Sequence, residues 1–392
     1  MTDVFLISAA RAAIGSFGGS LKDQKPGELA GRIMKAAMER GGVAPDLIGH
    51  VMLGNVVHTE PRDAYNARIA AIAAGAPQES AAMTVNRLCG SGLQAIINAS
   101  QSLLLGDCDI AIGAGVEVMS RAPYYLPDAR WGRKMGNAAV QDGLVGALTD
   151  PFQNIHMGVT AENVAERYGI SREDQDGLAL ESQTRAAHAI AQGYFRDQIV
   201  PLEIEAGRKT VVFDTDEYVR KDAAIGDFEK LKPVFKKDGT VTAGNASGIN
   251  DGAAAVVLAS GAAVTAHGLK PMARLVAYGH AGVDPAYMGI GPVPATRNAL
   301  KRAGLTLADI DVIEANEAFA AQACAVAKEL DFDPAKVNPN GSGISLGHPI
   351  GATGAIITTK LVHELHRTGG RYGLVTMCIG GGQGIAAIWE RV

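Results

Sequence analysis

Residues 83–114 of the chain read MTVNRLCGSGLQAIINASQSLLLGDCDIAIGA. The residues from Met83 to Arg87 predict a strand, and those from Gly92 to Leu105 have the apolar spacing of a helix. A glycine-rich turn joins the two, and a second apolar run from Cys108 to Ala114 predicts a buried strand. This order of strand, turn, helix and strand is typical of an α/β fold, in which helices cover both faces of a sheet.

Strands and helices continue to alternate on both sides of this stretch. Before it, apolar runs predict strands over 4–9 and 48–57, and residues spaced as on one helix face predict helices over 28–39 and 66–74. After about residue 248 the alternation resumes. There we predict strands over 253–258, 273–278, 311–315, 374–378 and 385–389, and helices over 295–302, 317–330 and 351–366.

The first and last thirds of the chain share a layout. Cys89-Gly90-Ser91-Gly92 leads into a helix and then a strand, and so does the segment from His348 to Gly354. We therefore predict duplicated halves whose glycine-containing turns face each other. Between them, Ser120 to Ile155 lacks periodicity, and Ser171 begins a helix with a capping-box pattern. Gly207 to Asp238 is dense in charge, which favours a solvated excursion.

The composition argues against several classes of protein. The 392 residues predict roughly two to three domains, and a formal net charge of −5 argues against a nucleic-acid binder. The chain has no run of 18 apolar residues, so no membrane span is expected, and its first residues do not resemble a signal peptide. Four cysteines without CxxC spacing argue against a disulfide framework and against a metal site. The sequence thus predicts a cytoplasmic protein.

Cys89 is the first candidate for chemistry. It lies in the predicted turn between a strand and a helix, where Gly90 and Gly92 allow a sharp change of direction. The positive end of the following helix favours a thiolate, and free backbone N–H groups there favour an oxyanion. A buried, inert cysteine in a glycine-rich turn is the alternative.

Three further segments carry candidate groups. His348 lies on the second turn, where it is placed to accept a proton from a thiol, and Pro349 after it suits the first position of a helix. Cys378 ends an apolar strand and is followed by three glycines, whose N–H groups can bind negative charge. Asn316 follows a predicted strand and is equally well explained as a helix N-cap.

Together these segments resemble one family from end to end, the thiolases, which are acetyl-CoA acyltransferases. The closest likeness is to bacterial biosynthetic-type, broad-range β-ketothiolases, which feed polyester synthesis. The segments occur in family order and spacing. They are residues 86–92, His156-Met157-Gly158, residues 242–248, Asn316-Glu317-Ala318-Phe319, Gly347-His348-Pro349, and Cys378 with its glycines.

The resemblance implies a five-layered αβαβα sandwich of two βαβαβ halves. The N-terminal half would span 1–118 and the C-terminal half 248–392, with a loop domain over 119–247 that serves coenzyme A binding and assembly. Tyr125 to Ala139 corresponds to the tetramerisation loop, so a homotetramer, a dimer of dimers, is expected.

The resemblance also implies the activity. The chain would catalyse the reversible Claisen condensation of acetyl-CoA with acetyl-CoA or a short acyl-CoA, and the CoA-dependent thiolysis of short 3-oxoacyl-CoA. Acetyl-CoA, acyl-CoA and free CoA would be its partners as substrates, with no separate cofactor. Either an acetyl-CoA C-acetyltransferase or a β-ketothiolase is implied.

The roles of individual residues follow from the same resemblance. Cys89 would be the nucleophile, His348 its base, and Cys378 the group that moves the α-proton of acetyl-CoA. Asn316 would hold a water that completes one oxyanion site with His348, and the N–H groups of Cys89 and Gly380 would form the second. Both thiols could act because a thiol pKa is movable toward neutral.

The implied coenzyme A contacts lie mainly in the middle third. Ser247 would touch the pantetheine arm, Ala318 and Phe319 would line its tunnel, and Arg220 and Phe235 would hold the adenine. His156 and Met157 would form a lid near the acyl group, with Met157 favouring unbranched chains. A ketoacyl synthase of similar fold is one alternative, but it uses a Cys–His–His site. A non-catalytic lipid carrier is another, but it would be expected to lose the catalytic side chains that are all present here.

Overall fold

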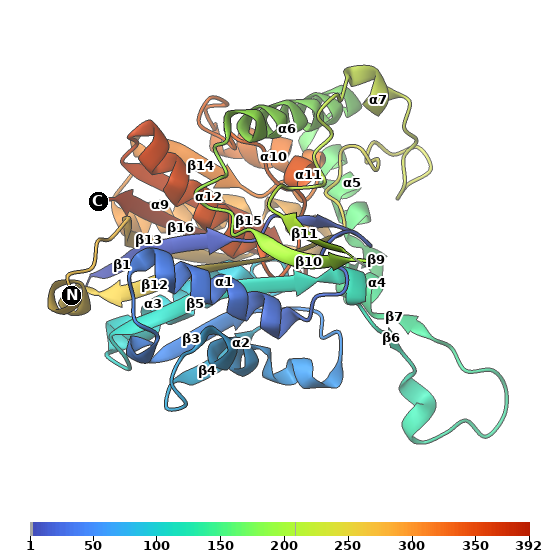
Figure 1. The fold of residues 1–392 in the computed structure, drawn as a ribbon. Coiled ribbons are helices and arrows are strands. Elements are labelled where there is room, and N and C mark those ends of the chain that lie inside the picture. Colours follow the sequence, from blue (N-terminus) through green and yellow to red (C-terminus); the bar gives the residue numbers. More distant parts are fainter. Residues whose placement is uncertain (1–2, 208) are drawn as a thin grey trace.

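The computed structural model describes residues 3–207 and 209–392. Ten of its strands form one large sheet that consists of two parts, and the other strands of the described residues pair in three two-stranded sheets (Figure 1). The N-terminal part has the order β1-β12-β5-β3-β4, in which β3, β4 and β5 run parallel and β12 runs antiparallel to β1 and β5. These strands are β1 (Val4–Arg11), β12 (Asn250–Ser260), β5 (Ile110–Val118), β3 (His50–Gly54) and β4 (Ala81–Val85), with the short β2 (Gly15–Ser16) beside β12.

The second part repeats this pattern. Its order is β13-β16-β15-β14, with β14 and β15 parallel and β16 antiparallel to both neighbours. A parallel bridge between Ile313 and Val337 extends it at the position that β4 occupies in the first part. The strands are β13 (Ala273–Gly282), β16 (Gln383–Arg391), β15 (Tyr372–Ile379) and β14 (Val312–Ala315). The predicted duplication is therefore visible in strand order and direction.

The two parts meet along a narrow seam. β1 and β13 pair only at Phe5 with Arg274 and at Leu6 with Ala273. Beyond this seam the two parts separate, and helices fill the space between them. The predicted division at 247/248 assigns β12 to the C-terminal half. In the structure this strand lies between β1 and β5 of the N-terminal part and is hydrogen-bonded to both.

Helices form three layers around these strands (Figure 1). α1 (Pro26–Gly41) and α2 (Asn66–Ala74) cover the outer face of the N-terminal part, and α9 (Pro292–Ala303) covers the outer face of the C-terminal part. α3 (Ser91–Leu105) and α12 (Thr353–Thr368) lie between the two parts, because α3 packs on β3 and β5 while α12 contacts β12, β14 and β15. This arrangement is the predicted five-layered α/β sandwich.

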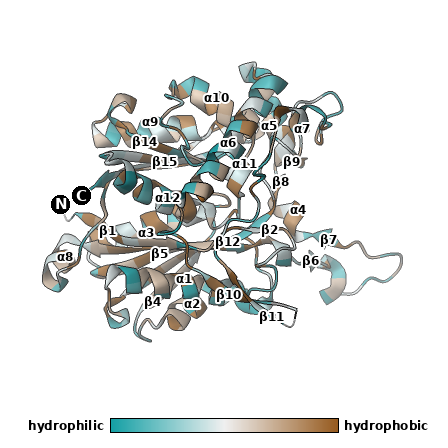
Figure 2. Cartoon of the chain, turned by 45° about the horizontal axis from the view of Figure 1, so that its top comes forward, coloured by the Kyte–Doolittle hydropathy of each residue, from teal (hydrophilic) through white to brown (hydrophobic). Residues whose placement is uncertain are grey.

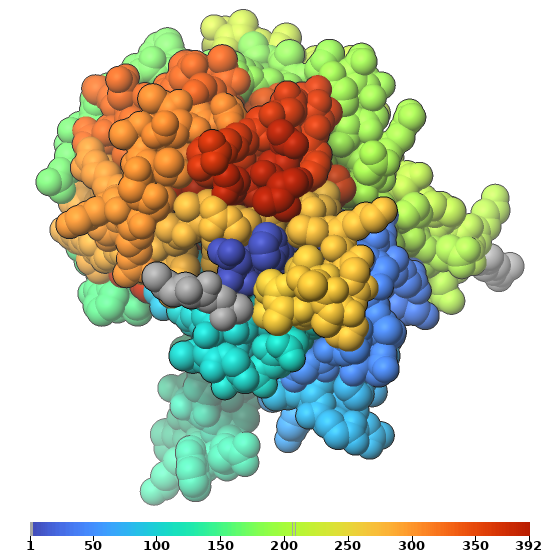
Figure 3. Space-filling model, turned by 90° about the vertical axis from the view of Figure 1, so that its left-hand side faces the viewer, coloured from blue at the N-terminus to red at the C-terminus, as the bar shows by residue number. Residues whose placement is uncertain are grey.

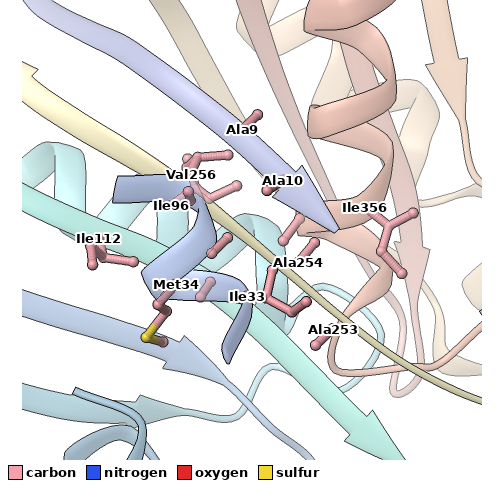
Figure 4. Packing of buried hydrophobic residues seen from close by; sticks show 14 of the residues in the cluster. Ala9, Ala10, Ile33, Met34, Ile96, Ile112, Ala253, Ala254, Val256 and Ile356 are labelled. Carbon is pink, nitrogen blue, oxygen red and sulfur yellow. The ribbon is translucent and has the colours of Figure 1, made fainter. Parts of the chain in front are cut away.

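The core is built mainly from small and branched apolar residues. Figure 4 shows apolar side chains of α1, α3 and α12 packed against those of β1, β5 and β12. Ile33, Ile96 and Ile356 come from the helices, Ile112 and Val256 come from the strands, and all five are buried. Glycines let the central helices approach closely. A Cβ on Gly92 of α3 would lie 2.8 Å from the backbone N of Ala355 in α12.

The middle third surrounds one end of the sandwich. Its longer helices are α5 (Met157–Tyr168) and α6 (Arg172–Gln192), and α6 begins with the predicted capping box between Ser171 and Asp174. Its other elements are short: β6 (Tyr124–Tyr125), β7 (Gln141–Asp142), α4 (Gly143–Ala147), β8 (Thr149–Asp150), β9 (Ile155–His156), β10 (Leu202–Ala206), β11 (Lys209–Phe213), α7 (Ile225–Glu229) and the 3₁₀ segments η3 (Met119–Arg121) and η4 (Pro127–Arg130).

The elements outside the middle third that complete the fold are α8 (Gly261–His267), α10 (Ala320–Leu330), α11 (Gly343–Leu346) and the 3₁₀ segments η1 (Pro45–Leu47), η2 (Pro61–Tyr65), η5 (Pro285–Ile290) and η6 (Leu307–Asp309).

Two regions of the middle third differ in exposure. The segment between β6 and β7 projects from the body of the protein as an arm, which Figures 1 and 3 show from two sides. In Figure 2 this arm carries both hydrophobic and hydrophilic residues. The charge-dense segment 207–238 is only partly the solvated excursion that its composition favours. Asp216 within it is buried and forms a two-pronged ion pair with buried Arg11, at 2.7 and 2.9 Å.

Candidate active site

The turn between β4 and α3 projects Cys89 from the end of a strand. Leu88 before it has a φ of 45°, in the left-handed region. Ser91 holds this strained turn closed, because its Oγ accepts from the N–H of Arg87 at 2.9 Å and donates to the carbonyl of Leu88 at 2.6 Å. The predicted strand–turn–helix geometry is confirmed, and Cys89 stands directly before the N-terminus of α3.

Gly90 explains how the second half reaches this turn. A Cβ at Gly90 would lie 2.5 Å from Cδ1 of Ile379 in β15, so the missing side chain gives the Ile379 side chain its place against the turn. The end of β15 carries Cys378, whose side chain is buried. Cys378 and Cys89 line the same cavity.

The backbone N–H groups of Gly380 and of Cys89 itself are placed to bond the sulfur of Cys89. They lower the pKa of this thiol, but its burial has the larger effect and raises the pKa to about 11. Burial also raises the pKa of Cys378. Desolvation thus outweighs the helix N-terminus and the N–H groups, and it moves the pKa of both thiols away from neutral in this structure.

His348 lies between α11 and α12 and enters the cavity from the side opposite β4. Its backbone N–H donates to Oδ1 of Asn250 at 3.0 Å, and its Nδ1 lies 2.6 Å from Oγ1 of Thr353. Burial lowers the pKa of His348 to about 4, so the imidazole is neutral at physiological pH. α12 begins at Thr353, so the prediction that Pro349 occupies the first helical position is wrong. The turn that contains His348 therefore continues past Pro349, and the helix begins two residues after its predicted start at Gly351.

Asn316 directly follows β14 and lies beside His348. Its Nδ2 is 3.5 Å from Nε2 of the histidine, and its side chain is buried. The alternative role as a helix N-cap is wrong, because α10 begins at Ala320 and is preceded by Phe319. Oδ1 of Asn316 is buried without a hydrogen-bond partner among the described residues. Such an orphaned acceptor is a typical place for an ordered water.

These groups meet at a cavity of about 360 Å³ between the sandwich and the middle third. Nine of the sequence-predicted residues line it. They are Cys89, His156, Met157, Phe235, Ser247, Ala318, Phe319, His348 and Cys378.

The wall next to the middle third is aromatic. The rings of His156 and Phe235 stack with centroids 4.7 Å apart, and Phe319 meets Phe235 edge-on at 6.2 Å. Nδ1 of His156 accepts from the N–H of Gly158 at 3.0 Å, so the other ring nitrogen of this neutral histidine carries the proton. A flat wall of this kind suits an apolar, unbranched chain.

Three predicted residues lie outside the cavity wall. Gly380 lies beside Cys89, whose sulfur its N–H can bond, and Asn316 lies beside His348. Arg220 is exposed, and its backbone N–H donates to Oε1 of Gln183 at 2.8 Å. Phe235 lines the cavity, and Arg220 does not.

Sequence reasoning missed part of the lining. Met119, Leu148, Tyr218 and Met288 come from four separate segments, and their types carry no local signal. Only Tyr218, an aromatic residue within the charge-dense segment, stands out in the sequence. Among residues 3–207 and 209–392, no group of three or more His, Cys, Asp or Glu side chains could hold a metal ion. None of the helices in these ranges is long and apolar enough to cross a membrane.

Comparison with known proteins matches both halves of the chain. The thiolase N-terminal domain matches residues 4–262, and the thiolase C-terminal domain matches residues 269–391. The chain is 64% identical to beta-ketothiolase BktB of Cupriavidus necator over 100% of this chain and 99% of that protein. It is 46% identical to the human mitochondrial 3-ketoacyl-CoA thiolase over 98% of this chain and 97% of that protein.

Solved structures agree with this comparison. The acetyl-CoA acetyltransferase of Bacillus anthracis superposes with a TM-score of 0.98 at 49% identity, over 100% of this chain and 99% of that chain. The human mitochondrial 3-ketoacyl-CoA thiolase in complex with CoA superposes with a TM-score of 0.97 at 46% identity, over 100% of this chain and 98% of that chain.

Proposed function

The chain belongs to the thiolase family, and we propose that it works through an acyl-Cys89 intermediate in the cavity described above. It is an acyl-CoA:acetyl-CoA C-acyltransferase. In one direction it condenses acetyl-CoA with acetyl-CoA or a short acyl-CoA, and in the other it cleaves short 3-oxoacyl-CoA with free CoA. The observation that carries the proposal is the meeting of two thiols and one imidazole at a single cavity, with the amide of Asn316 beside the imidazole.

The first step transfers an acyl group to Cys89. The thiol proton passes to Nε2 of His348 while the sulfur attacks the thioester carbonyl, and the departing CoA sulfur then takes that proton. Both partners start neutral, because burial raises the pKa of the thiol to about 11 and lowers that of the imidazole to about 4. Proton transfer is therefore coupled to attack, as general-base catalysis requires.

The second step forms the carbon–carbon bond. Cys378 acts as the thiolate and takes the α-proton of acetyl-CoA, and the resulting enolate attacks the acyl carbonyl on Cys89. The departing Cys89 thiolate then takes that proton from Cys378, which restores both groups to their starting forms. In thiolysis Cys378 returns that proton to the departing enolate. A water held between Asn316 and His348 stabilises the enolate oxygen by donating one proton to it. Its other proton goes to the orphaned Oδ1 of Asn316, because Nε2 of the neutral His348 carries a lone pair and cannot itself donate. The N–H groups of Cys89 and Gly380 stabilise the oxyanion on the acyl group.

Coenzyme A would enter along the aromatic wall. The cavity is narrow enough for a pantetheine arm between Ser247, Phe319 and the stacked pair of His156 and Phe235. Arg220, whose side chain is exposed, would hold the nucleotide end. Met157 closes the acyl end, which favours short, unbranched acyl groups. No further cofactor is needed, because nucleophile, base and oxyanion donors all belong to the chain.

The arm between β6 and β7 supports a homotetramer. Its apolar side chains project into solvent, and Trp131 and Met135 are 89% and 87% exposed. Large exposed apolar groups of this kind mark a binding surface, and we assign it to a second copy of the chain. The segment 119–247 would thus serve both assembly and coenzyme A binding. The four cysteines are free thiols, which fits a cytoplasmic location.

Peptide mass spectrometry after mixing the protein with acetyl-CoA and quenching in acid tests the intermediate. We expect an acetyl group on the peptide that contains Cys89 and none in the Cys89→Ser variant. Folded wild-type protein with an unmodified Cys89 would contradict the proposal. Native mass spectrometry tests assembly, because replacing residues 126–139 by a short glycine–serine linker should convert tetramers to dimers.

A further inference from the structure

The hydrogen bonds around Nδ1 of His348 determine which nitrogen of the ring carries the proton. Nδ1 lies 2.6 Å from Oγ1 of Thr353, and the Thr353 hydroxyl donates to the carbonyl of Pro349 at 2.9 Å. A hydroxyl has one proton, and here that proton is directed to the carbonyl. The threonine oxygen can therefore only accept from the ring, so Nδ1 of the neutral imidazole is protonated.

The contact on the other side of the ring agrees with this tautomer. The neighbour of Nε2 is the amide nitrogen of Asn316, which can donate but not accept. An unprotonated Nε2 suits this neighbour and a protonated one does not. Both partners thus favour the tautomer in which Nε2 presents a lone pair to the cavity.

We propose that Thr353 is a positioning residue for catalysis, which holds His348 in the tautomer whose Nε2 can accept the Cys89 proton. The proposal rests on the roles proposed above for Cys89 and His348. Thr353 does not line the cavity and touches no substrate position. It acts through the histidine, as the acceptor that fixes an imidazole tautomer does in other acid–base sites.

The place of Thr353 in the fold supports this role. It is the first residue of α12, and its side chain is buried. The bond from its hydroxyl to Pro349 reaches back four residues, across the turn that contains His348. The threonine therefore links the rigid helix to both the ring and the backbone of the catalytic turn. Among the described residues, Oγ1 of Thr353 is the one hydrogen-bond acceptor found for Nδ1.

The same helix offers a matched control. Thr359 is also buried, and its hydroxyl donates to the carbonyl of Ala355 four residues earlier at 2.9 Å, but it does not contact His348. Thr353→Val and Thr359→Val therefore make the same chemical change in the same helix. Thr353→Ser keeps the oxygen at the ring and should rescue the function.

The experiment measures alkylation of Cys89 by iodoacetamide between pH 6 and pH 10, with the modified peptide quantified by mass spectrometry. This reaction needs a nucleophilic Cys89 but no acyl-CoA. At pH 7 we expect Thr353→Val to slow it by about 10- to 100-fold, the lower part of the range for loss of a positioned base. Toward pH 10 the difference between the rates should narrow, because hydroxide then ionises a growing share of a thiol whose pKa is about 11. Thr353→Ser and Thr359→Val should follow the wild type throughout.

Other outcomes would overturn the proposal. A merely structural role predicts that Thr353→Val lowers the rate by the same factor at every pH, or no more than Thr359→Val does. If Thr353→Val does not fold, ¹⁵N NMR of the histidine-labelled wild type decides, because a His348 signal with the proton on Nε2 contradicts the assignment. Acetylation of wild-type Cys89 by acetyl-CoA is measured in parallel. Its absence would refute the proposed function rather than the role of Thr353.

Discussion

The backbone N–H of Gly351 donates a 2.9 Å hydrogen bond to Oε2 of Glu117. Glu117 lies in β5 of the N-terminal part, and Gly351 lies three residues after His348. The same carboxyl group accepts from the N–H groups of Val56 and Val57, each at 3.0 Å. One fully buried side chain thus ties the turn that carries the catalytic histidine to the sheet that leads to the nucleophile.

Glu117→Gln is expected to destabilise the protein. An amide has one acceptor oxygen instead of two, so at least one buried N–H group loses its partner, which costs about 1–3 kcal/mol. The midpoint of urea unfolding should fall, and acetylation of Cys89 should slow as the His348 turn loosens. Glu181→Gln, which removes an exposed carboxylate paired with Arg185, is the control and should change stability by less than about 0.5 kcal/mol. Equal midpoints for Glu117→Gln and wild type would show that the clamp is dispensable.

The buried imidazole of His348 predicts a loss of stability in acid. Its pKa is about 4 in the folded protein, against 6.5 for a free side chain. Between these values the unfolded chain binds a proton that the folded protein does not, so stability falls as pH drops from about 6.5 to about 4. Urea midpoints at pH 7 and pH 5 should therefore differ less in His348→Asn than in wild type. His366→Asn, at an exposed position, should keep the wild-type difference. An unchanged difference in His348→Asn would refute the assignment.

Cys378→Ser should separate the two chemical steps. The hydroxyl of serine is a far weaker acid than a thiol, so proton transfer at the α-carbon should slow by about 10²- to 10⁴-fold. Acylation of Cys89 should continue, because His348 supplies its base. Rapid-quench mass spectrometry measures the acetyl enzyme, and formation of acetoacetyl-CoA measures condensation. Cys108→Ser, at a half-buried thiol outside the cavity, serves as the control. Loss of acylation in Cys378→Ser would mean that the division of labour is wrong.

Gly158→Ala tests the aromatic wall. A Cβ at Gly158 would overlap the ring of Phe235 and push it off His156. Because this wall would bind coenzyme A rather than the reacting atoms, we expect KM for acyl-CoA to rise by about 10-fold while kcat changes little. Gly177→Ala is the matched control, since a Cβ there meets nothing within 4 Å. A fall in kcat at unchanged KM would place Phe235 in the chemistry instead of in binding.

The sequence was a good guide wherever a signal is local. Apolar periodicity placed nearly every strand and helix of the sandwich, and the Ser171 capping box was predicted at the correct residue. The motifs around Cys89, His348 and Cys378 were recognisable because sharp turns and close backbone approach require glycine at particular positions. Gly90 is the clearest case, since its missing side chain gives the Ile379 side chain its place against the turn.

Errors arose where local chemistry allows two outcomes and packing chooses between them. Asn316 fits a helix cap as well as a catalytic amide, and only the start of α10 at Ala320 separates the two. The helix N-terminus at Cys89 suggested a thiol of low pKa, yet burial among side chains from both halves raises it. Desolvation depends on neighbours that are distant in the chain, so no local pattern reports it.

The sequence by itself determined the family and the layered α/β architecture, and it supplied the candidate reacting side chains, because each depends on residue type and short-range spacing. Only the tertiary structure decided which tautomer His348 adopts, how Glu117 joins the halves, and that β12 completes the N-terminal part. The hydrogen bond between His348 and Thr353 depends on where α12 starts. The hydrogen bond between Gly351 and Glu117 depends on how the turn before α12 packs against the N-terminal part of the sheet. Those positions are set by packing of the whole chain, which acts over distances that sequence patterns do not encode.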